Sequence, residues 1–312
     1  MNLINEKAID AYVKNFTFQK MLILPAILLI LSLLILGYTT YRTGAPLELG
    51  IEFKGGTAIT FDSPKTMDQL EEEFKGFPGV QVREFGGGDR KLMQFGPMDA
   101  SLKDDLVTRT KTEFTNVEIR DMGEVFSKSL QSQAVRAIFI SFIFMGIVVF
   151  ITFRTFVPAG AVLISAFADI AFAAAMMDVF GIVLSLGTVA ALLMLIGYSV
   201  DTDILLTTRL LKRKGELAEK IKDAMKTGLT MTTTTLAALI ALFFVSSGSY
   251  IISSFTRIDI IRDISIVLIF GLIADIINTW MTNVGILKWY MEKKERKIEK
   301  RIEKPKKRRQ TA

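Results

Sequence analysis

Two aspartates stand inside an apolar stretch of this chain. The stretch runs from Val179 to Val200 without a charge, and Asp201 and Asp203 follow within the same hydrophobic segment. A carboxylate deep in a helix of bilayer length costs about 2.5–3.5 kcal/mol on insertion scales, so it usually faces protein or water. Gain and loss of a proton or another cation, coupled to movement, is the chemistry that such a group can perform.

Asp201 and Asp203 are two residues apart, so on a helix they point to nearly opposite sides and do not form one site together. A structural alternative is that they are anchored near the inner end of the span by Arg209 or Lys212. Lys226, at the start of the next apolar block, is either a counter-charge to an aspartate or an interface lysine.

Asp169 and Asp275 are two further carboxylates in apolar surroundings. Asp169 shares a helical face with Ser165 and Ala173. Asp275 belongs to a stripe of small and polar residues at spacings of three and four, which is typical of a packed helix–helix seam: Gly271, Asp275, Asn278, Thr282 and Gly285. For Asp275, packing and ion relay fit equally well. The threonines at 227, 230 and 232–235 are interpreted as bonding their own helix carbonyls.

The composition excludes several kinds of chemistry. The chain has 312 residues, is 50% apolar and contains no Cys and no His. Disulfides, thiolates and imidazole ligands are therefore absent, and no nucleotide-binding glycine loop followed by Lys occurs. The net charge of +6 comes from basic residues beside the apolar blocks, without aromatic stacking partners. We expect no enzyme activity, cofactor, metal or nucleic-acid partner.

The apolar blocks predict a mainly α-helical polytopic membrane protein with six transmembrane helices. The expected spans are 21–41, 136–154, 157–177, 181–207, 228–248 and 263–286. The predicted organisation is a cytoplasmic segment 1–20, a first helix 21–41, an external domain 42–134, a five-helix bundle 135–287 and a basic tail 288–312.

Lys and Arg set the expected orientation. Basic residues in 1–20, near 154, in 209–226 and beyond 288 fall on one side of a six-span protein, and the positive-inside rule makes that side cytoplasmic. Both termini are then inside and residues 45–130 outside. The basic cytoplasmic segments, including 304–309, are expected to meet anionic lipids.

The external segment predicts a small α+β domain. Residues 50–61, 80–85, 91–95 and 117–120 have strand patterns, and two helices are expected, one capped at Ser63-Pro64 and one starting at Asp99. The order β-α-β-β-α-β is the ferredoxin-like pattern. The glycines at 86–88 indicate a hairpin turn rather than a phosphate cradle.

Two glycine motifs resemble the SecF family of protein-export membrane proteins, in its archaeal form. Gly50-Ile51-Glu52-Phe53-Lys54-Gly55-Gly56-Thr57 is similar to the signature after that family's first span. Gly197-Tyr198-Ser199-Val200 followed by acidic residues is similar to its fourth-span motif, with Arg209 at the place of a family arginine. Bacterial members read Gly-Tyr-Ser-Val-Asn-Asp-Thr, with the Asp implicated in proton flow. Here Asp201, Thr202 and Asp203 fill the last three places, and Lys226 replaces an arginine linked to that Asp.

The resemblance implies a fold of the RND half-transporter type in the plasma membrane. It also implies a complex with SecD, association with the Sec translocon, contact with the translocating polypeptide and use of the proton-motive force. A passive scaffold subunit without ion coupling and an RND-like exporter of lipids or small hydrophobic molecules remain as alternatives. An intramembrane aspartyl protease is disfavoured because its Gly-x-Gly-Asp motif is absent.

Overall fold

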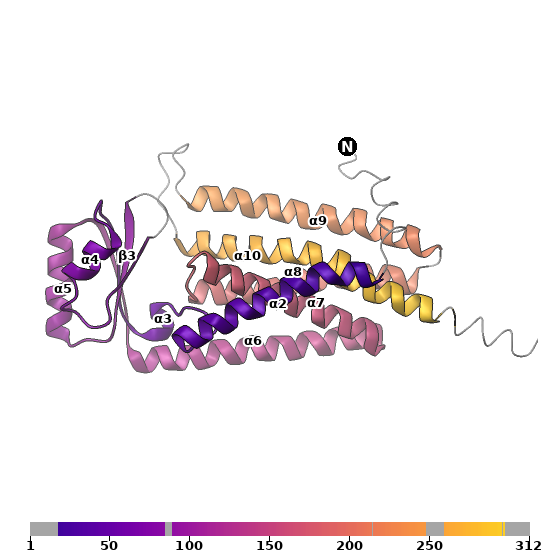
Figure 1. The fold of residues 1–312 in the computed structure, drawn as a ribbon, viewed down its shortest axis with the longest axis horizontal. Helices are drawn as coiled ribbons and strands as arrows, with labels where there is room; N and C mark the ends of the chain where they lie inside the picture. Colours follow the sequence, from indigo (N-terminus) through magenta and orange to yellow (C-terminus); the bar gives the residue numbers. More distant parts are fainter. Residues whose placement is uncertain (1–17, 85–88, 214, 248–258, 295, 297–312) are drawn as a thin grey trace, which may run out of the picture.

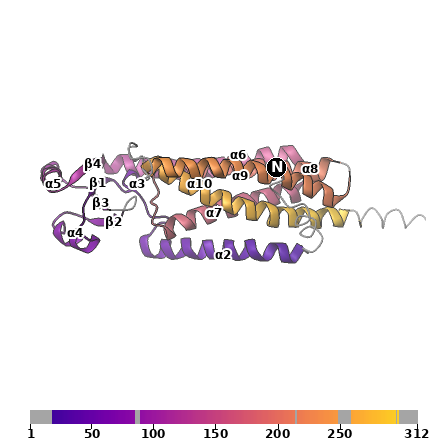
Figure 2. The same ribbon diagram turned by 90° about the horizontal axis from the view of Figure 1, so that it is seen from above.

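The computed structural model describes residues 18–84, 89–213, 215–247, 259–294 and 296. A small sheet domain sits at one end of a long helical bundle, as Figures 1 and 2 show from two directions. The glycine turn expected at 86–88 and the basic tail at 304–309 lie outside the described residues.

Within the described residues, five helices are long and apolar enough to cross a membrane: α2 (Phe18–Thr43), α6 (Glu124–Phe153), α7 (Phe156–Val179), α8 (Leu186–Lys212) and α9 (Leu217–Ser246). The sixth expected span corresponds to α10 (Asp259–Ile277), which continues into the π-helix η1 (Asn278–Asn283). The chain is α-helical again from 284 to 294.

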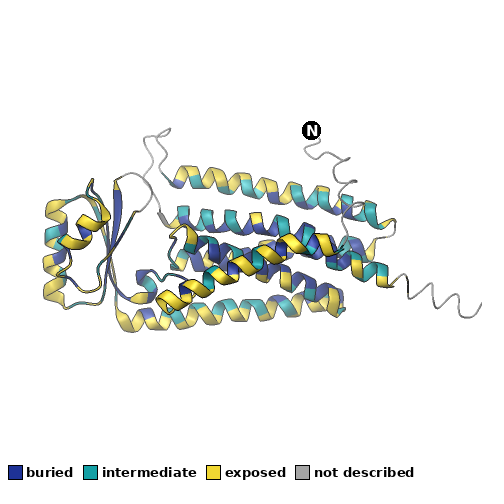
Figure 3. Ribbon diagram, in the orientation of Figure 1, coloured by how far each residue is buried: buried dark blue, intermediate teal, exposed yellow. Residues whose placement is uncertain are grey.

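The helices divide into an inner and an outer set (Figure 3). In the most apolar window, 61% of α7 and 56% of α8 is buried, against 17% of α2 and 11% each of α6 and α9. Many buried positions of α7 are alanines, which allow close helix approach without a hydrophobic driving force. The outer helices present apolar side chains outward, which fits a lipid or protein environment.

The sheet domain lies between α2 and α6 in the sequence. Its elements are α3 (Ile51–Lys54), β1 (Gly56–Asp62), α4 (Met67–Glu73), β2 (Gln81–Glu84), β3 (Arg90–Phe95), α5 (Ala100–Glu113) and β4 (Thr115–Met122). The strands pair in the order β2-β3-β1-β4, and every pair is antiparallel. From β1 onward the chain follows the β-α-β-β-α-β order expected from the sequence. Phe61, Phe74 and Phe95 are central to a core between sheet and helices.

Several boundaries differ from the sequence prediction; the fourth expected span begins at Leu186 rather than 181 and the fifth at Leu217 rather than 228. Residues 50–61 do not form one strand, because Gly55 and Gly56 have φ values of +76° and +108° and separate the short helix α3 from β1. Helix α4 is capped by Thr66 rather than Ser63. Helix α6 starts at Glu124 and not near 135. Its first turns are polar, so hydropathy detects only the later, apolar part of the helix.

The sheet domain is joined to the bundle through backbone hydrogen bonds. The Gly50 N–H donates to the Leu184 carbonyl at 2.8 Å, and the Leu184 N–H donates to the Glu48 carbonyl at 2.7 Å. Ser127 of α6 donates to the Ile51 carbonyl at 3.4 Å. We call the pairing of residues 48–50 with Leu184 the junction. It connects the start of the sheet domain to the loop between α7 and α8.

Gly56→Ala is expected to disrupt the pairing of β1 with β3. A Cβ at this position would lie 2.0 Å from the Phe95 carbonyl oxygen, and the φ of +108° is itself strained for an L side chain. Hydrogen exchange of the full-length protein should show faster exchange in both strands. Gly76→Ala, where a Cβ meets nothing within 4 Å, is the control and should not change exchange.

The stability of the sheet domain should depend on pH through Asp121. Partial burial raises the pKa of this carboxyl, but hydrogen bonds from Lys103 and from Thr57 of the glycine motif outweigh burial and lower the pKa below its usual value. A lowered folded pKa stabilises the domain above the unfolded value of about 3.9, and that contribution disappears as pH falls through the folded pKa.

Asp121→Asn should therefore destabilise the sheet domain at neutral pH and flatten its loss of stability in acid. Both effects are measured by thermal unfolding of the full chain at several pH values, with hydrogen exchange in β1 and β4 as the readout. Asp105→Asn, an exposed position in α5, is the matched control. An unchanged acid dependence in Asp121→Asn would contradict the assignment.

Candidate functional site

Three aspartates meet inside the bundle, one each from α7, α8 and α10. Asp169 of α7, Asp203 of α8 and Asp275 of α10 all have 0% exposed surface. Polar groups from α8, α10 and η1 surround them. Their common position satisfies the expectation that intramembrane carboxylates face protein rather than lipid.

Asp169 is held between two helices. The Ser199 hydroxyl of α8 donates to its Oδ2 at 2.6 Å, and the Asn278 side-chain amide of η1 donates to its Oδ1 at 2.6 Å. Both short bonds supply protons to carboxylate oxygens, so α7, α8 and η1 are fixed around one acid.

Asp203 and Asp275 share one hydroxyl group. The Thr279 Oγ1 lies 2.8 Å from Asp203 Oδ1 and 3.1 Å from Asp275 Oδ1, and Asn283 Nδ2 donates to the same Asp203 oxygen at 2.7 Å. A hydroxyl has one proton to donate and lone pairs to accept. The two contacts are therefore both satisfied in full when one of the two carboxyl groups carries a proton and donates it to Thr279.

We call these seven residues the carboxylate network: Asp169, Ser199, Asp203, Asp275, Asn278, Thr279 and Asn283. None of its three acids forms an ion pair with a Lys or Arg in the part of the chain that the structure describes. Ser165 of α7 is also fully buried, beside Asp203. Among the described residues, no positive charge balances the three carboxylates of the network.

The π-helix explains how one helix reaches two acids. In an α-helix residues four apart lie above one another, whereas a π-helix bonds residue i to i+5. Asn278 and Asn283, five apart, each donate to a carboxylate, one on α7 and one on α8. Close packing supports the arrangement, because Gly271 leaves room for Leu195 and Gly228 leaves room for the Trp280 ring.

The other predicted relay residues lie elsewhere. Asp201 is exposed on the opposite side of α8 from Asp203, as their spacing predicts. Arg209 pairs with the Asp223 carboxylate at 2.7 Å and does not anchor either α8 aspartate. Lys226 is exposed and forms no ion pair with another described residue. The structure thus brings together only Asp169, Asp203 and Asp275 of the predicted set.

The two glycine motifs have different structural roles. In the fourth-span motif, Gly197 and Tyr198 are exposed, while Ser199 is buried against Asp169. The first motif, Gly50 to Thr57, forms the junction, α3 and the start of β1, with Ile51 and Phe53 buried. The threonines of α9 bond carbonyls of their own helix, as expected.

Sequence reasoning missed Thr279 and Asn283. Both are polar residues in an apolar segment, spaced by four, and that signal alone could have identified them. The stripe through Asp275, Asn278 and Thr282 was followed instead, because an ideal α-helical period places Thr279 and Asn283 beside that stripe and not on it.

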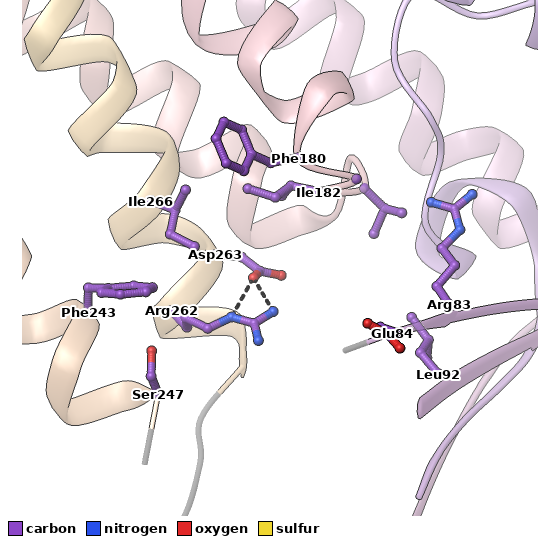
Figure 4. A pocket seen from close by; sticks show the side chains of 12 residues that line it. Arg83, Glu84, Leu92, Phe180, Ile182, Phe243, Ser247, Arg262, Asp263 and Ile266 are labelled. Carbon is purple, nitrogen blue, oxygen red and sulfur yellow. Dashed lines mark hydrogen bonds and ion pairs between the residues drawn. The ribbon is translucent and has the colours of Figure 1, made fainter. Parts of the chain in front are cut away.

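A separate cavity of about 390 Å³ lies between the sheet domain and the bundle (Figure 4). Arg83 and Glu84 line it from the sheet side, and the ion-paired Arg262 and Asp263 line it from α10. It contains none of the three network aspartates, so it is distinct from the carboxylate network.

Comparison with known proteins decides the family. Residues 102–293 match the family model for the C-terminal part of the protein export membrane proteins SecD and SecF. A SecF from Methanolacinia petrolearia is 47% identical over 281 residues, which are 90% of this chain and 96% of that protein. The chain belongs to the SecF family of protein-export membrane proteins. The resemblance of its glycine motifs predicted this membership.

Further SecF relatives and a solved structure agree. A SecF from Methanocaldococcus jannaschii is 41% identical over 280 residues, covering 86% of this chain and 94% of that protein. The crystal structure of SecDF, a translocon-associated membrane protein from Thermus thermophilus, matches with a TM-score of 0.70 at 22% identity. The match covers 88% of this chain but 38% of the SecDF chain, so it shows a shared fold with part of a longer protein.

Asn283 is expected to stabilise the bundle through Asp203. Removing its amide leaves a buried carboxylate with one donor fewer, and such side-chain bonds in membrane bundles contribute about 0.6 kcal/mol on average and about 1.7 at most. A double-mutant cycle of Asn283→Ala and Asp203→Ala, measured by unfolding in mixed micelles, should give a coupling energy in this range, because each single variant removes the hydrogen bond. Thr234→Ala, an exposed hydroxyl on α9, should show none. Zero coupling between Asn283 and Asp203 would contradict the network.

Proposed function

We propose that this SecF-family chain acts with SecD to promote polypeptide translocation across the cell membrane, and that the carboxylate network couples this work to an ion gradient. We count α10 with η1 as a sixth crossing, which places both termini in the cytoplasm and the sheet domain, with residues 45–130, outside. The proposed role is mechanical and involves no covalent chemistry. The basic cytoplasmic segments would contact anionic lipid.

The shared Thr279 hydroxyl is the observation that carries the coupling proposal. Three acids lie in one buried volume without a cation from the described residues, and a charge in such a place is costly. One proton held between Asp203 and Asp275 relieves this cost and satisfies both contacts of Thr279. Loss of that proton adds a charge to the network and favours a different packing of α10 and η1 against α8.

A path to the sheet domain supports the mechanical half of the proposal. The acids of the network lie on α7, α8 and α10, and the loop between α7 and α8 contains Leu184. Leu184 exchanges two backbone hydrogen bonds with residues 48–50, which lead directly into α3 and β1. A shift between α7 and α8 would therefore displace the base of the domain that we propose meets the emerging polypeptide.

The exposed face of α8 supports a protein partner. Gly197, Tyr198 and Asp201 lie together on a face that no described residue covers. A carboxylate on a membrane helix requires protein or water beside it rather than lipid. SecD is the partner proposed for this face, since the SecDF chain contains a second part of which this chain has no counterpart.

Asp203→Asn should abolish the gradient-dependent part of export. Asn cannot take up or release a proton, so Asp203 and Asp275 can no longer share one across Thr279, and the network loses that change of charge. The measurement is polypeptide translocation into vesicles that contain this chain, SecD and a translocon, with and without an imposed proton or sodium gradient. Export that keeps its full gradient dependence in Asp203→Asn would leave the passive scaffold as the better function.

Asp201→Asn is the matched control, because it makes the same chemical change two residues away, outside the network. Export by the Asp201→Asn variant should keep its gradient dependence in every preparation in which the complex assembles. Co-purification with SecD reports assembly separately and should weaken in this variant if the exposed α8 face is the SecD contact. A gradient effect lost in Asp201→Asn and kept in Asp203→Asn would reverse the assignment.

A further inference from the structure

A basic cavity lies where α2 ends and the sheet domain begins. Its volume is about 280 Å³, and its lining includes Arg42 and Thr43 of α2, Glu48, Lys54 of α3, and Gln81 and Arg83 of β2. Helix α2 ends on the sheet-domain side of the bundle (Figure 1), and the lining contains no residue of the carboxylate network. Arg83 also borders the cavity of Figure 4, on the side opposite the Arg262–Asp263 pair.

The lining has more positive than negative charge. Three cations, Arg42, Lys54 and Arg83, stand against one carboxylate, Glu48, which is already ion-paired with Arg83. Lys54 has only a long contact, 3.5 Å, to the Gln81 side-chain oxygen. Partial burial and the charge of Arg83 lower the pKa of Lys54, even though Glu48 acts in the opposite direction. The cations therefore crowd one another, and an additional anion would relieve them.

The mouth of this cavity lies at the level expected for a membrane surface. Helix α2 is apolar up to its last turns, where Tyr38 and Tyr41 are 67% and 92% exposed. Tyrosines of this kind are enriched at the membrane–water interface. Arg42 follows immediately and ends the apolar face, so lipid headgroups would lie beside Arg42 and acyl chains along the exposed side of α2.

We propose that this cavity binds the phosphate group of an anionic membrane lipid, on the side of the membrane that faces the sheet domain. The guanidinium of Arg83, which also pairs with Glu48, and the ammonium of Lys54 supply the positive charge that attracts phosphate oxygens. Arg42 contacts the headgroup from α2. The lipid thus bridges α2 and the sheet domain beside the junction. The proposal needs membrane insertion of α2 and does not depend on gradient coupling.

The test is lipid binding to the full-length protein without any gradient. The protein is placed in nanodiscs of a zwitterionic lipid that contain a minor fraction of phosphatidylglycerol. Native mass spectrometry then releases the protein from the nanodisc and counts the anionic lipid molecules that it retains. Arg42→Gln and Lys54→Gln should each weaken retention about fivefold, the effect of one basic residue near an anionic surface. Lys111→Gln, an exposed lysine of α5, is the matched control and should change nothing.

Several results would overturn the proposal. Retention unchanged in the Arg42→Gln/Lys54→Gln double variant, or lowered equally by Lys111→Gln, would show that the cavity does not select the lipid. Displacement of the lipid by inorganic phosphate at equal concentration would assign the site to free phosphate, and preferential binding of an acidic peptide would assign it to polypeptide. Lys54→Arg keeps the charge and should keep retention, which separates charge from misfolding.

Discussion

The structure depends on how three carboxylates are accommodated where no basic side chain of the described chain balances them. Each of Asp169, Asp203 and Asp275 is fully buried, and each contacts a side chain from another position in the sequence. In a medium of low dielectric an unpaired polar group is costly, so the donors of η1 are as necessary as the acids. This constraint accounts for the alanine-rich α7, for the glycines at 228 and 271, and for the π-helical turn. Each of these features lets neighbouring helices of the bundle approach closely.

The carboxylate network is also connected, through α7 and α8, to the sheet domain. The acids fix the relative positions of α7 and α8, and the loop between these helices is bonded to residues 48–50. The first glycine motif is thus explained by backbone geometry: Gly50 approaches Leu184, and Gly55 and Gly56 adopt positive φ. In the second motif Ser199 and Val200 are buried and Ser199 bonds Asp169, whereas Gly197 and Tyr198 are exposed on the face proposed for SecD.

Much of this was predictable from the sequence, and particular residues show where prediction stopped. Hydropathy located the apolar helices, and the spacing of Asp201 and Asp203 correctly predicted that only one faces the interior. The order of strands and helices along the sheet domain followed from strand and helix-cap signals. Thr279 and Asn283 could be recognised as polar residues in an apolar segment, but the acids that they bond could not be predicted, because those contacts depend on a π-helical turn that the pattern of apolar residues does not encode. Arg209 was misassigned because its partner, Asp223, comes from the following helix, and sequence spacing within α8 does not reveal that contact.

The central claim is that the Asp203–Asp275 pair, joined by Thr279, holds a proton. Isotope-edited infrared spectroscopy of the full-length protein in lipid tests it most directly, with aspartate carboxyl carbons labelled. We predict a carboxylic-acid C=O band at neutral pH that disappears in Asp203→Asn or Asp275→Asn and persists in Asp201→Asn. A spectrum with only ionised carboxylate bands at neutral pH, unchanged by all three substitutions in the acid region, would contradict the account.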